Sequence, residues 1–586
     1  MPDFVWTIGS FVFFTALVGV ISWYLTRKDN LSTNTGYFLA GRSLSGIVIC
    51  GSLILTNLSA EQLIGLNGNG FMSGISSMSW EVTSGFTLVL MALIFLPRYL
   101  KGGFTTIPEY LERRYDRQTR NIVTGLFLLS LVLVTLPIVL YAGGIAMNSL
   151  FNVSEILGIS EDESLNLVIL LSGVIGGLYA IFGGLKAVAV SDTINGIGLL
   201  IGGLLIPVLG LMALGDGSVL SGMDVLITQY PEKMNAIGDE KASTPFATIF
   251  TGILLVNTFY WCTNQQIVQR TFAAKNLVEG QKGVLIAGFI KLCVPFILLI
   301  PGIIAYVLYK DEIGRQDMAY AILVNHVLPL PLVGFFGAVL LGAVLSTFDS
   351  ALNSASTMFC LNLYKPLFAP QISDRKLVTV GKIFGIVLVV FSVFIAPYIA
   401  RAPEGLYTFM RSIMGFFNIP ILAVVLVGFF SHRIPPVGAK VAIAFFMICY
   451  ALYKFVFDIP VHYLHVYGIL FACCVLIMYV FGRIAPMEKP YYDYEARVVD
   501  LTPWVWARAG SAFIITSTIY IYTLFSPVGI VGYGTEYGLR LLVITLIYAA
   551  LTAVLVMGFY LRDRKLIATH KGRNVHVDNQ LAAVKG

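Results

Sequence analysis

The sequence predicts an all-α polytopic membrane protein with about 15 transmembrane helices. Of its 586 residues, 57% are apolar and only 12% are charged, whereas a soluble domain carries roughly 25% charged residues. A helical span needs about 20 predominantly apolar residues, and such runs follow one another along nearly the whole chain. This composition excludes a nucleic-acid-binding protein, a secreted disulfide scaffold and an ordinary soluble enzyme.

The individual spans are read from these apolar runs, with boundaries that shift by a few residues. The first run lacks a basic leading segment and a small-residue cleavage site, so we expect a retained span rather than a signal peptide. The predicted spans cover residues 4–26, 46–72, 75–97, 121–150, 165–184, 188–214, 246–268, 283–309, 331–364, 378–400, 404–431, 437–457, 461–482, 509–529 and 537–561.

The orientation follows from the distribution of basic residues between alternate loops. With the N-terminus outside, 29 of the 38 Lys and Arg residues fall in cytoplasmic segments and 7 in external ones. Lys and Arg accumulate in the cytoplasmic loops of membrane proteins. We therefore expect a multi-pass protein of the inner or plasma membrane, with the N-terminus outside and the C-terminus in the cytoplasm.

Polar residues and glycines interrupt the second and seventh spans, which lie five spans apart. This spacing is expected of two inverted five-helix repeats whose binding sites lie at the interrupted helices. The predicted units are an N-terminal span and loop (1–45), a first repeat (46–214), an external loop (215–245), a second repeat (246–431), four additional spans (432–561) and a flexible cytoplasmic tail (562–586).

The second span carries the sequence T56-N-L-S-A-E-Q-L-I-G-L-N-G-N-G70 at membrane depth. Discontinuous helices free backbone carbonyls and helix ends to coordinate ions and solutes. Asn57 and Gln62 supply both hydrogen-bond donors and acceptors, which suits a hydroxylated ligand. The alternative is a kink stabilised by neighbouring spans.

Asn257, Tyr260, Trp261 and Asn264 crowd the seventh span at positions i, i+3, i+4 and i+7. On a continuous helix these residues share one face. Aromatic rings beside amides suit a sugar. An aromatic ring stacks on the C–H face of the sugar, while the amides form hydrogen bonds with the sugar hydroxyls. The alternative is an aromatic anchor at the membrane interface, since Arg270 is expected to mark the nearby cytoplasmic boundary.

In the ninth span, Ala343, Ser346, Thr347 and Ser350 also share a helix face. Two adjacent hydroxyls beside small residues suit a sodium ion, which needs several oxygen ligands. The alternative is close helix packing, which small residues also permit.

Ionisable residues inside spans are costly and therefore candidates for function. Glu81 and Lys291 carry opposite charges in separate spans, and pairing would compensate both burials; a purely structural ion pair is the alternative. The six candidates are Glu61, Glu81, Asp192, Lys291, Asp349 and Arg411.

Several blocks in the first 430 residues resemble the solute:sodium symporter family, and within it the sodium/glucose and sodium/galactose cotransporter branch. These blocks are N57-L-S-A-E-Q62, I107-P-E-Y-L-E-R-R-Y115, G183-G-L-K-A-V-A-V-S-D192, N257-T-F-Y-W261, Q281-K-G283 and L345-S-T-F-D-S-A-L-N-S354. The resemblance implies a leucine-transporter-like five-plus-five inverted repeat that works by alternating access. It also implies a transporter of sodium and sugar rather than an enzyme.

The resemblance further implies roles for particular residues. The sodium ion would be bound by the carbonyls of Leu55, Leu58 and Ala343 and the hydroxyls of Ser346 and Thr347, with Asp192 near its inward route. Tyr260 would cap the sugar as a stacking gate. The other implied sugar-binding residues are Asn57, Gln62, Glu81, Ser84, Asn257, Lys291 and Ser350.

Two residues depart from the family pattern. Arg411 stands where the sugar transporters have a neutral glutamine, and Asp349 adds a carboxylate beside the implied sodium hydroxyls. Arg411 could bind an acidic substrate bidentately, or pair with a carboxylate such as Asp349. The sequence therefore predicts sodium-coupled monosaccharide import, with an acidic or modified sugar, or another small solute, as alternatives. A channel or sensor with the same fold is the competing class.

Overall fold

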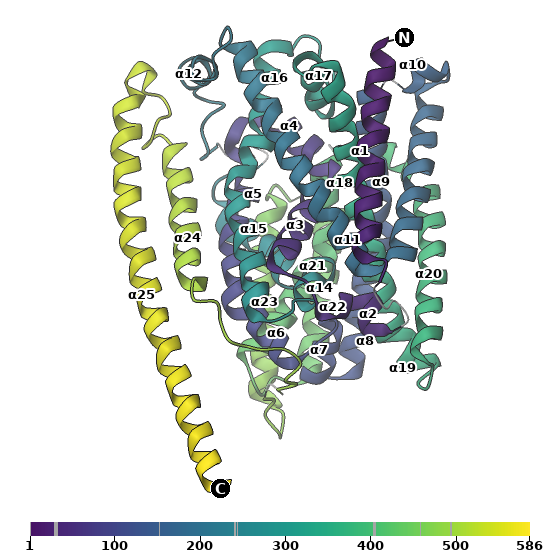
Figure 1. Cartoon of the computed structure of the whole chain (residues 1–586), viewed down its shortest axis with the longest axis vertical. Coiled ribbons are helices and arrows are strands. Elements are labelled where there is room, and N and C mark those ends of the chain that lie inside the picture. The colour runs from purple at the N-terminus through teal and green to yellow at the C-terminus, as the bar shows by residue number, and fades with distance from the viewer. Residues whose placement is uncertain are drawn as a thin grey trace.

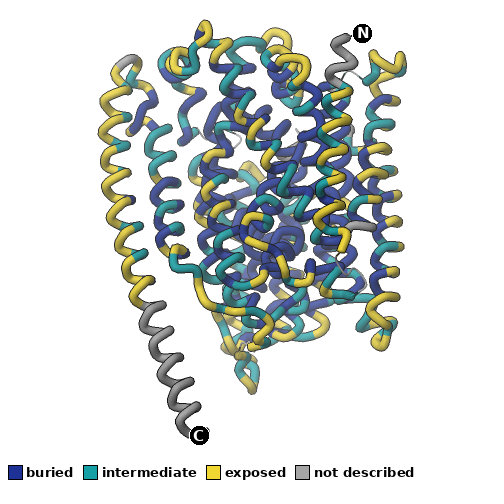
Figure 2. The backbone as a smooth tube through the Cα atoms, in the orientation of Figure 1, coloured by how far each residue is buried: buried dark blue, intermediate teal, exposed yellow. Residues whose placement is uncertain are grey.

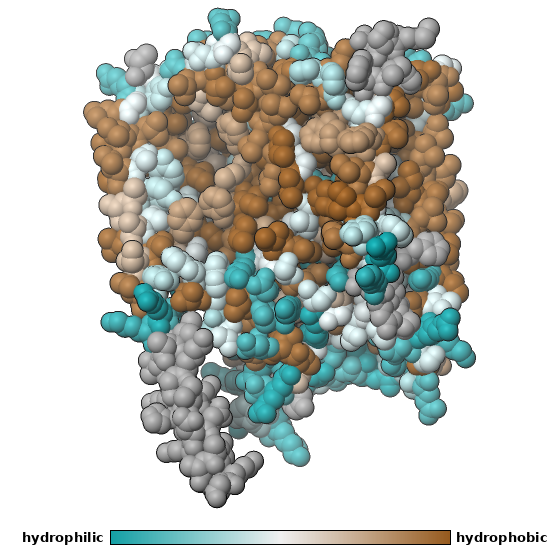
Figure 3. Space-filling view, in the orientation of Figure 1, coloured by the Kyte–Doolittle hydropathy of each residue, from teal (hydrophilic) through white to brown (hydrophobic). Residues whose placement is uncertain are grey.

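The computed structural model describes residues 2–28, 33–151, 153–238, 242, 244–401, 406–457, 459–492 and 495–585. The described residues form helices and connecting turns and contain no β-strand. One isolated β-bridge among them joins Leu44 and Ala274. Hydrophobic side chains form a broad belt across the visible face, with hydrophilic side chains at both ends (Figure 3). This arrangement fits a bundle that crosses a bilayer.

The N-terminal segment and first predicted repeat comprise eleven α-helices. The long α11 contains Gly184 at φ +65°, a backbone conformation that divides it between the predicted fifth and sixth spans. The helices are α1 (Pro2–Thr26), α2 (Asn34–Leu39), α3 (Gly46–Asn57), α4 (Ala60–Ser73), α5 (Ser79–Leu90), α6 (Leu96–Gly102), α7 (Ile107–Arg114), α8 (Arg117–Leu129), α9 (Leu136–Phe151), α10 (Val153–Leu157) and α11 (Glu161–Leu214).

The external loop, the second repeat and the C-terminal spans complete the bundle. Their helices are α12 (Val219–Gln229), α13 (Leu254–Cys262), α14 (Gln265–Phe272), α15 (Leu277–Leu298), α16 (Ile300–Tyr309), α17 (Ala319–Val327), α18 (Leu330–Met358), α19 (Lys365–Phe368), α20 (Asp374–Ile395), α21 (Leu406–Phe430), α22 (Pro436–Phe455), α23 (Tyr463–Ile484), α24 (Ala507–Leu524) and α25 (Tyr537–Lys585).

Twelve described helices are long and apolar enough to cross a membrane. They coincide with all predicted spans except the second, seventh and fourteenth; the second and seventh are broken into shorter helices, and the fourteenth is the 18-residue α24. The two termini lie at opposite ends of the bundle, and α10, α12 and α17 lie at the N-terminal end (Figure 1). This arrangement agrees with an odd number of crossings and with the predicted alternation of loops.

The centre of the bundle is buried, whereas α1 and α25 lie at its edges (Figures 1 and 2). Helix α3 packs against α11 and α15, and α18 packs against α1 and α11. Helix α25 continues to Lys585 through the segment predicted to be a flexible tail. The ion pair between Asp563 and Arg508, 3.1 Å apart, ties its extension to α24.

Asp116 begins α8 outside the membrane-spanning segments. Its carboxylate accepts hydrogen bonds from the Thr119 N–H (2.7 Å) and from Lys440 (2.9 Å). Burial alone would raise the pKa of Asp116, but these hydrogen bonds outweigh burial and lower the pKa below its ordinary value. The charged form of Asp116 therefore stabilises the folded state.

We expect Asp116→Ala to destabilise the protein by about 1 kcal/mol, the usual cost of losing an N-cap. Because the folded-state pKa is depressed, this stabilisation is present above the unfolded-state pKa and is lost as the pH falls through the folded-state pKa. Thermal unfolding in detergent between neutral and acid pH would measure it. Asp311→Ala, at an exposed position, is the control; equal effects of the two changes at every pH would contradict the assignment.

Candidate functional site

The predicted interruption of the second span lies at Leu58 and Ser59, between α3 and α4. In a continuous helix, the N–H groups of Ser59 and Gln62 would bond to the carbonyls of Leu55 and Leu58. They donate instead to the carbonyls of Asn57 (2.9 Å) and Ser59 (3.1 Å). The break thus releases the two carbonyls that the family resemblance assigned to sodium.

The seventh span is also broken, which changes one part of the sequence prediction. Helix α13 ends at Cys262, and Asn264 caps α14 by accepting a hydrogen bond from the Gln266 N–H at 3.0 Å. Asn264 therefore does not extend the helix face of Asn257 and Trp261, and the prediction that it does was wrong. The interfacial-anchor alternative also fails, because the Trp261 side chain is only 1% exposed.

Helix α18 passes the end of α3 and carries the predicted sodium hydroxyls. The Thr347 hydroxyl lies 3.2 Å from the Thr56 carbonyl and 3.1 Å from that of Ala343, so it connects α18 to α3. The Ser346 hydroxyl is buried and lines the same cavity as Asp192. The contact of Thr347 with the end of α3 thus brings hydroxyl and carbonyl oxygens together, and such oxygens are the ligands that a hard cation takes.

Glu81 on α5 and Lys291 on α15 form the buried ion pair that their opposite charges predicted. Lys291 also donates a hydrogen bond to the side-chain oxygen of Asn57 at the end of α3. The Lys291 side chain is fully buried and its ammonium lies 5.7 Å from the centroid of a Trp261 ring. The pair therefore joins three helices around the break in the second span.

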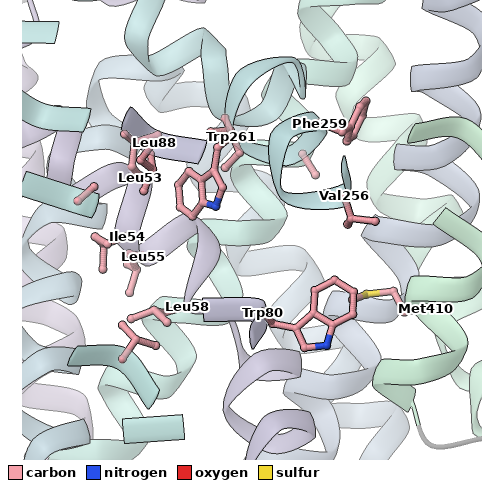
Figure 4. Packing of buried hydrophobic residues seen from close by; sticks show 14 of the residues in the cluster. Leu53, Ile54, Leu55, Leu58, Trp80, Leu88, Val256, Phe259, Trp261 and Met410 are labelled. Atoms are coloured by element: carbon pink, nitrogen blue, oxygen red, sulfur yellow. The ribbon is translucent and has the colours of Figure 1, made fainter. Parts of the chain in front are cut away.

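Other predicted sugar-binding residues surround this pair. Asn257 donates hydrogen bonds to the Trp80 carbonyl (2.9 Å) and the Thr83 hydroxyl (2.7 Å), and Ser84 donates to the Trp80 carbonyl. Figure 4 shows the buried Trp80 and Trp261 around the Leu53–Leu58 segment, with Met410 next to Trp80. Helices α3 and α5 of the first repeat and α13 and α21 of the second thus share one aromatic and polar environment.

Two aromatic residues of α13, Tyr260 and Trp261, contact each other. The rings of Tyr260 and Trp261 lie edge to face with centroids 5.1 Å apart. The Trp261 indole N–H and the Gln62 side-chain oxygen are both buried without a hydrogen-bond partner among the described residues. A buried donor and a buried acceptor that lack partners are groups that a hydroxylated ligand could satisfy.

Ser350, which stays a predicted sugar contact, also belongs to a buried charged network. The network centres on Arg270, which is fully buried and donates to the hydroxyls of Ser52 (2.7 Å) and Ser350. Its guanidinium lies 3.7 Å from the Asp192 carboxylate, and Ser52 donates to the same carboxylate at 2.6 Å. Arg270 thus connects α14 with α3, α11 and α18.

Arg270 is the main functional candidate that the sequence interpretation missed. It was assigned to a cytoplasmic boundary because it follows an apolar run. The signal was present in Q265-Q-I-V-Q-R270, where the four polar residues share one side of a short helix that follows a break. Gln266 and Gln269 are buried with it and bond to the Thr347 carbonyl and the Thr357 hydroxyl.

The two departures from the family pattern lie in different places. Asp349 is buried near the charges of Asp192 and Arg270, and one of its oxygens has no hydrogen-bond partner among the described residues. Arg411 on α21 lies with its guanidinium 5.2 Å from a ring centroid of Trp80. The structure therefore places Arg411 beside Trp80, whereas Asp349 lies near the Arg270 network.

A cavity of about 630 Å³ reaches this network from the side of α1. Thr26 and Arg27 line it at one end of α1, while Asp192, Ser346 and Asp349 line it inside the bundle. The predicted sodium hydroxyl at Ser346 is thus connected to a space bounded by α1, α11 and α18.

The sequence profile of the Sodium:solute symporter family matches residues 37–445. This range covers both broken helices and the residues around them. The chain belongs to the sodium:solute symporter family. It is therefore a multi-pass membrane transporter and not an enzyme, and sodium is its coupling ion.

Three curated relatives support the assignment of this chain to the family. It is 49% identical to the "Uncharacterized symporter YidK" of Escherichia coli (strain K12), over 90% of this chain and 92% of that protein. It is 32% identical to the sodium/glucose cotransporter of Vibrio parahaemolyticus, over 74% of this chain and 82% of that protein. It is 33% identical to the human sodium/myo-inositol cotransporter, over 72% of this chain and 63% of that protein.

Solved structures support the predicted fold. A Na+-coupled sialic acid symporter, in a substrate-bound outward-open state, matches with a TM-score of 0.71 at 19% identity, over 83% of this chain and 99% of that chain. A nucleobase-cation-symport-1 family transporter in a closed conformation matches with a TM-score of 0.53 at 16% identity, over 78% of this chain and 96% of that chain. The symporter thus has the leucine-transporter-like five-plus-five fold that the sequence predicted.

Proposed function

We propose that this symporter imports a neutral monosaccharide or a closely related polyhydroxylated solute together with sodium. The observation that carries this proposal is the buried Glu81–Lys291 pair, which lies beside Asn57 and Trp261. The Gln62 side-chain oxygen is a further buried acceptor, without a hydrogen-bond partner among the described residues. This combination offers acceptors, donors and a ring face to a hydroxylated ring. Two relatives are named for glucose and myo-inositol, which are both neutral polyhydroxylated rings.

An acidic sugar is the second candidate, and Arg411 is the observation that favours it. A guanidinium can bind a carboxylate with two parallel hydrogen bonds. The structural neighbour of highest similarity reported above is a symporter of sialic acid, an acidic sugar. At 19% identity, however, that likeness concerns the fold.

The proposed cycle begins with sodium at Leu55, Leu58, Ala343, Ser346 and Thr347. The ion would hold the end of α3 against α18 and so complete the sugar site. Sodium would therefore raise the affinity for sugar, and by linkage sugar would raise the affinity for sodium. We propose that the ion then leaves past Asp192 through the cavity bounded by α1.

The direction of transport follows from the proposed plasma-membrane location, with the N-terminus outside and the C-terminus cytoplasmic. The inward movement of one sodium ion releases about 2.3 kcal/mol per 100 mV of membrane potential. A tenfold sodium gradient adds about 1.4 kcal/mol. With one ion per sugar, these terms would sustain accumulation of roughly several hundredfold.

Uptake into proteoliposomes tests the proposal directly. Galactose, glucose, myo-inositol and glucuronate would be supplied with and without an inward sodium gradient. Sodium-driven accumulation of a neutral solute is the expected result. Accumulation of glucuronate alone would favour the acidic candidate, and equilibration without accumulation would indicate a channel.

Replacing both predicted sodium hydroxyls is expected to weaken the affinity of the symporter for sodium. We expect Ser346→Ala with Thr347→Ala to raise the half-saturating sodium concentration by roughly tenfold or more per lost ligand, since tenfold corresponds to ~1.4 kcal/mol. Initial uptake rates over a sodium series would measure the change. Ser356→Ala, which alters another buried serine of α18, is the matched control. An unchanged sodium dependence in the double variant would rule out this assignment.

A further inference from the structure

The cavity beside α1 combines apolar walls with a polar region inside the bundle. Its volume of about 630 Å³ lies within the range of small-molecule binding sites. Apolar atoms of α1, α11 and α18 form most of its wall. Trp23 and Leu178 line it and are more than half exposed, and α1 lies at the edge of the bundle (Figure 1). The cavity is therefore open at the outer surface of the bundle, between α1 and α11.

Asp349 on α18 lines this cavity inside the bundle. The residue is 1% exposed, and its Oδ1 is buried without a hydrogen-bond partner among the described residues. Gly176 of α11 leaves room for this oxygen, because a Cβ atom at Gly176 would lie 3.2 Å from it. A buried carboxylate without a partner is strongly unfavourable. Asp349 therefore offers an unused acceptor to a ligand in the cavity.

The basic residues around the cavity interact with other groups. Arg270 lies 3.7 Å from Asp192, which also accepts a hydrogen bond from Ser52. Arg27 is exposed at the end of α1, with its guanidinium 4.6 Å from the ring centroid of Tyr24. Within the described part of the chain, neither arginine forms an ion pair with Asp349. A ligand that bears a positive charge would supply the missing partner.

A protonated amine with an apolar body complements both features of the cavity. Its ammonium group would donate charge-assisted hydrogen bonds to the carboxylate, and its apolar body would be buried against the apolar walls. A sodium ion alone would leave most of this volume empty, since it takes oxygen ligands and the walls supply few. An alcohol of the same shape lacks the charge, and the corresponding carboxylate would be repelled by Asp349.

We propose that this cavity is a binding site for a hydrophobic monoamine, whose ammonium group pairs with Asp349 and whose apolar body lies between α1 and α11. Asp192 and Ser346 line the same cavity, on the route proposed for sodium release. A bound amine would therefore block this route and inhibit transport. This consequence rests on the proposed function, whereas the binding itself does not.

Thermal unfolding of the purified symporter in lipid nanodiscs measures binding without transport, because a ligand that binds only the folded protein stabilises it. The probes are 4-phenylbutylamine, 4-phenylbutanol and 4-phenylbutyrate, which share an apolar body and differ in charge. We expect the amine to bind about tenfold or more tightly than the alcohol, a difference of ~1.4 kcal/mol or more. The acid should bind more weakly than both. Equal affinities for the amine and the alcohol would overturn the proposal.

Two variants test the two parts of the site. Asp349→Asn keeps the shape of the side chain and should lower the affinity for the amine about tenfold or more, with little effect on the alcohol. Gly19→Leu fills the cavity from α1 without a clash, because a Cβ atom at Gly19 meets nothing within 4 Å. It should weaken binding of both probes to a similar extent.

Gly9→Leu is the matched control for Gly19→Leu. Gly9 lies at an exposed position of α1 outside the cavity, and a Cβ atom there also meets nothing within 4 Å. We expect this variant to bind the amine as the wild type does. If Asp349→Asn does not fold, Gly19→Leu decides. Wild-type affinity for the amine in Gly19→Leu, or in folded Asp349→Asn, would place the amine elsewhere and refute the site.

Uptake assays distinguish failure of this inference from failure of the proposed function. If the wild type accumulates a sugar, the amine should lower the maximal rate, and excess sugar should not restore it, because the two ligands occupy different sites. Binding of the amine without inhibition would refute the blocked route. If the wild type accumulates no sugar, the proposed function fails, and the binding measurements still decide whether the amine site exists.

Discussion

Replacing Lys291 by methionine is expected to abolish sodium-driven solute uptake and to destabilise the folded protein by about 3–5 kcal/mol. Lys291 is fully buried and binds both Glu81 and Asn57. Methionine fills much of the same volume but leaves the Glu81 carboxylate buried without its cation. Thermal unfolding in detergent and uptake in proteoliposomes would measure the two losses.

Neutralising the partner separates the stability effect from the transport effect. Lys291→Met with Glu81→Gln removes both charges, and we expect this variant to recover much of the lost stability. It should still fail to transport, because the ammonium and carboxylate that would contact the solute are both absent. Recovered transport would indicate the purely structural ion pair that the sequence left open.

Lys282→Met is the matched control, because Lys282 lies on the same helix and pairs with Glu279 at 2.9 Å in a partly exposed position. Such pairs contribute roughly 0–1 kcal/mol. We expect this variant to unfold and transport nearly as the wild type does. Wild-type uptake by Lys291→Met itself would refute the role proposed for the pair.

The spans were predictable because the bilayer restricts the hydrophobicity and charge of every residue in a chain that crosses it. The interruption of the second and seventh spans was predictable as well, since polar groups cannot lie unpaired at membrane depth, but the position of the break before Asn264 was not. Their consequences for neighbouring residues were harder to infer. Asn264 fits the face of an unbroken helix, and only the observed end of α13 at Cys262 shows that it caps the next helix.

The position of Arg270 illustrates a limit of counting basic residues. The positive-inside rule concerns loops and span ends, and a short helix after a break resembles such an end in sequence. The partners of Arg270 come from α3, α11 and α18, which are distant in the chain. Contacts between helices depend on tertiary packing, and for the same reason the sequence could not connect Arg411 with Trp80.

Arg270→Met is expected to have an effect of the same order as Lys291→Met. It leaves Asp192 without the guanidinium that lies 3.7 Å away and removes the contacts with Ser52 and Ser350. We expect a loss of about 3–5 kcal/mol in stability, as for other broken buried pairs. We also expect uptake to fall below detection, because these contacts hold α14 against both repeats.

Three comparisons would show whether charge or geometry is responsible. Arg270→Lys keeps the charge but not the planar set of five donors, so we expect it to recover stability only in part. Arg270→Met with Asp192→Asn removes both charges and should unfold closer to the wild type than Arg270→Met does. Arg375→Met, at an exposed position on α20, should leave stability and uptake nearly unchanged. If Arg270→Met unfolded at the wild-type temperature, Asp192 would have to be stabilised without it, and the buried network would not hold the two repeats together.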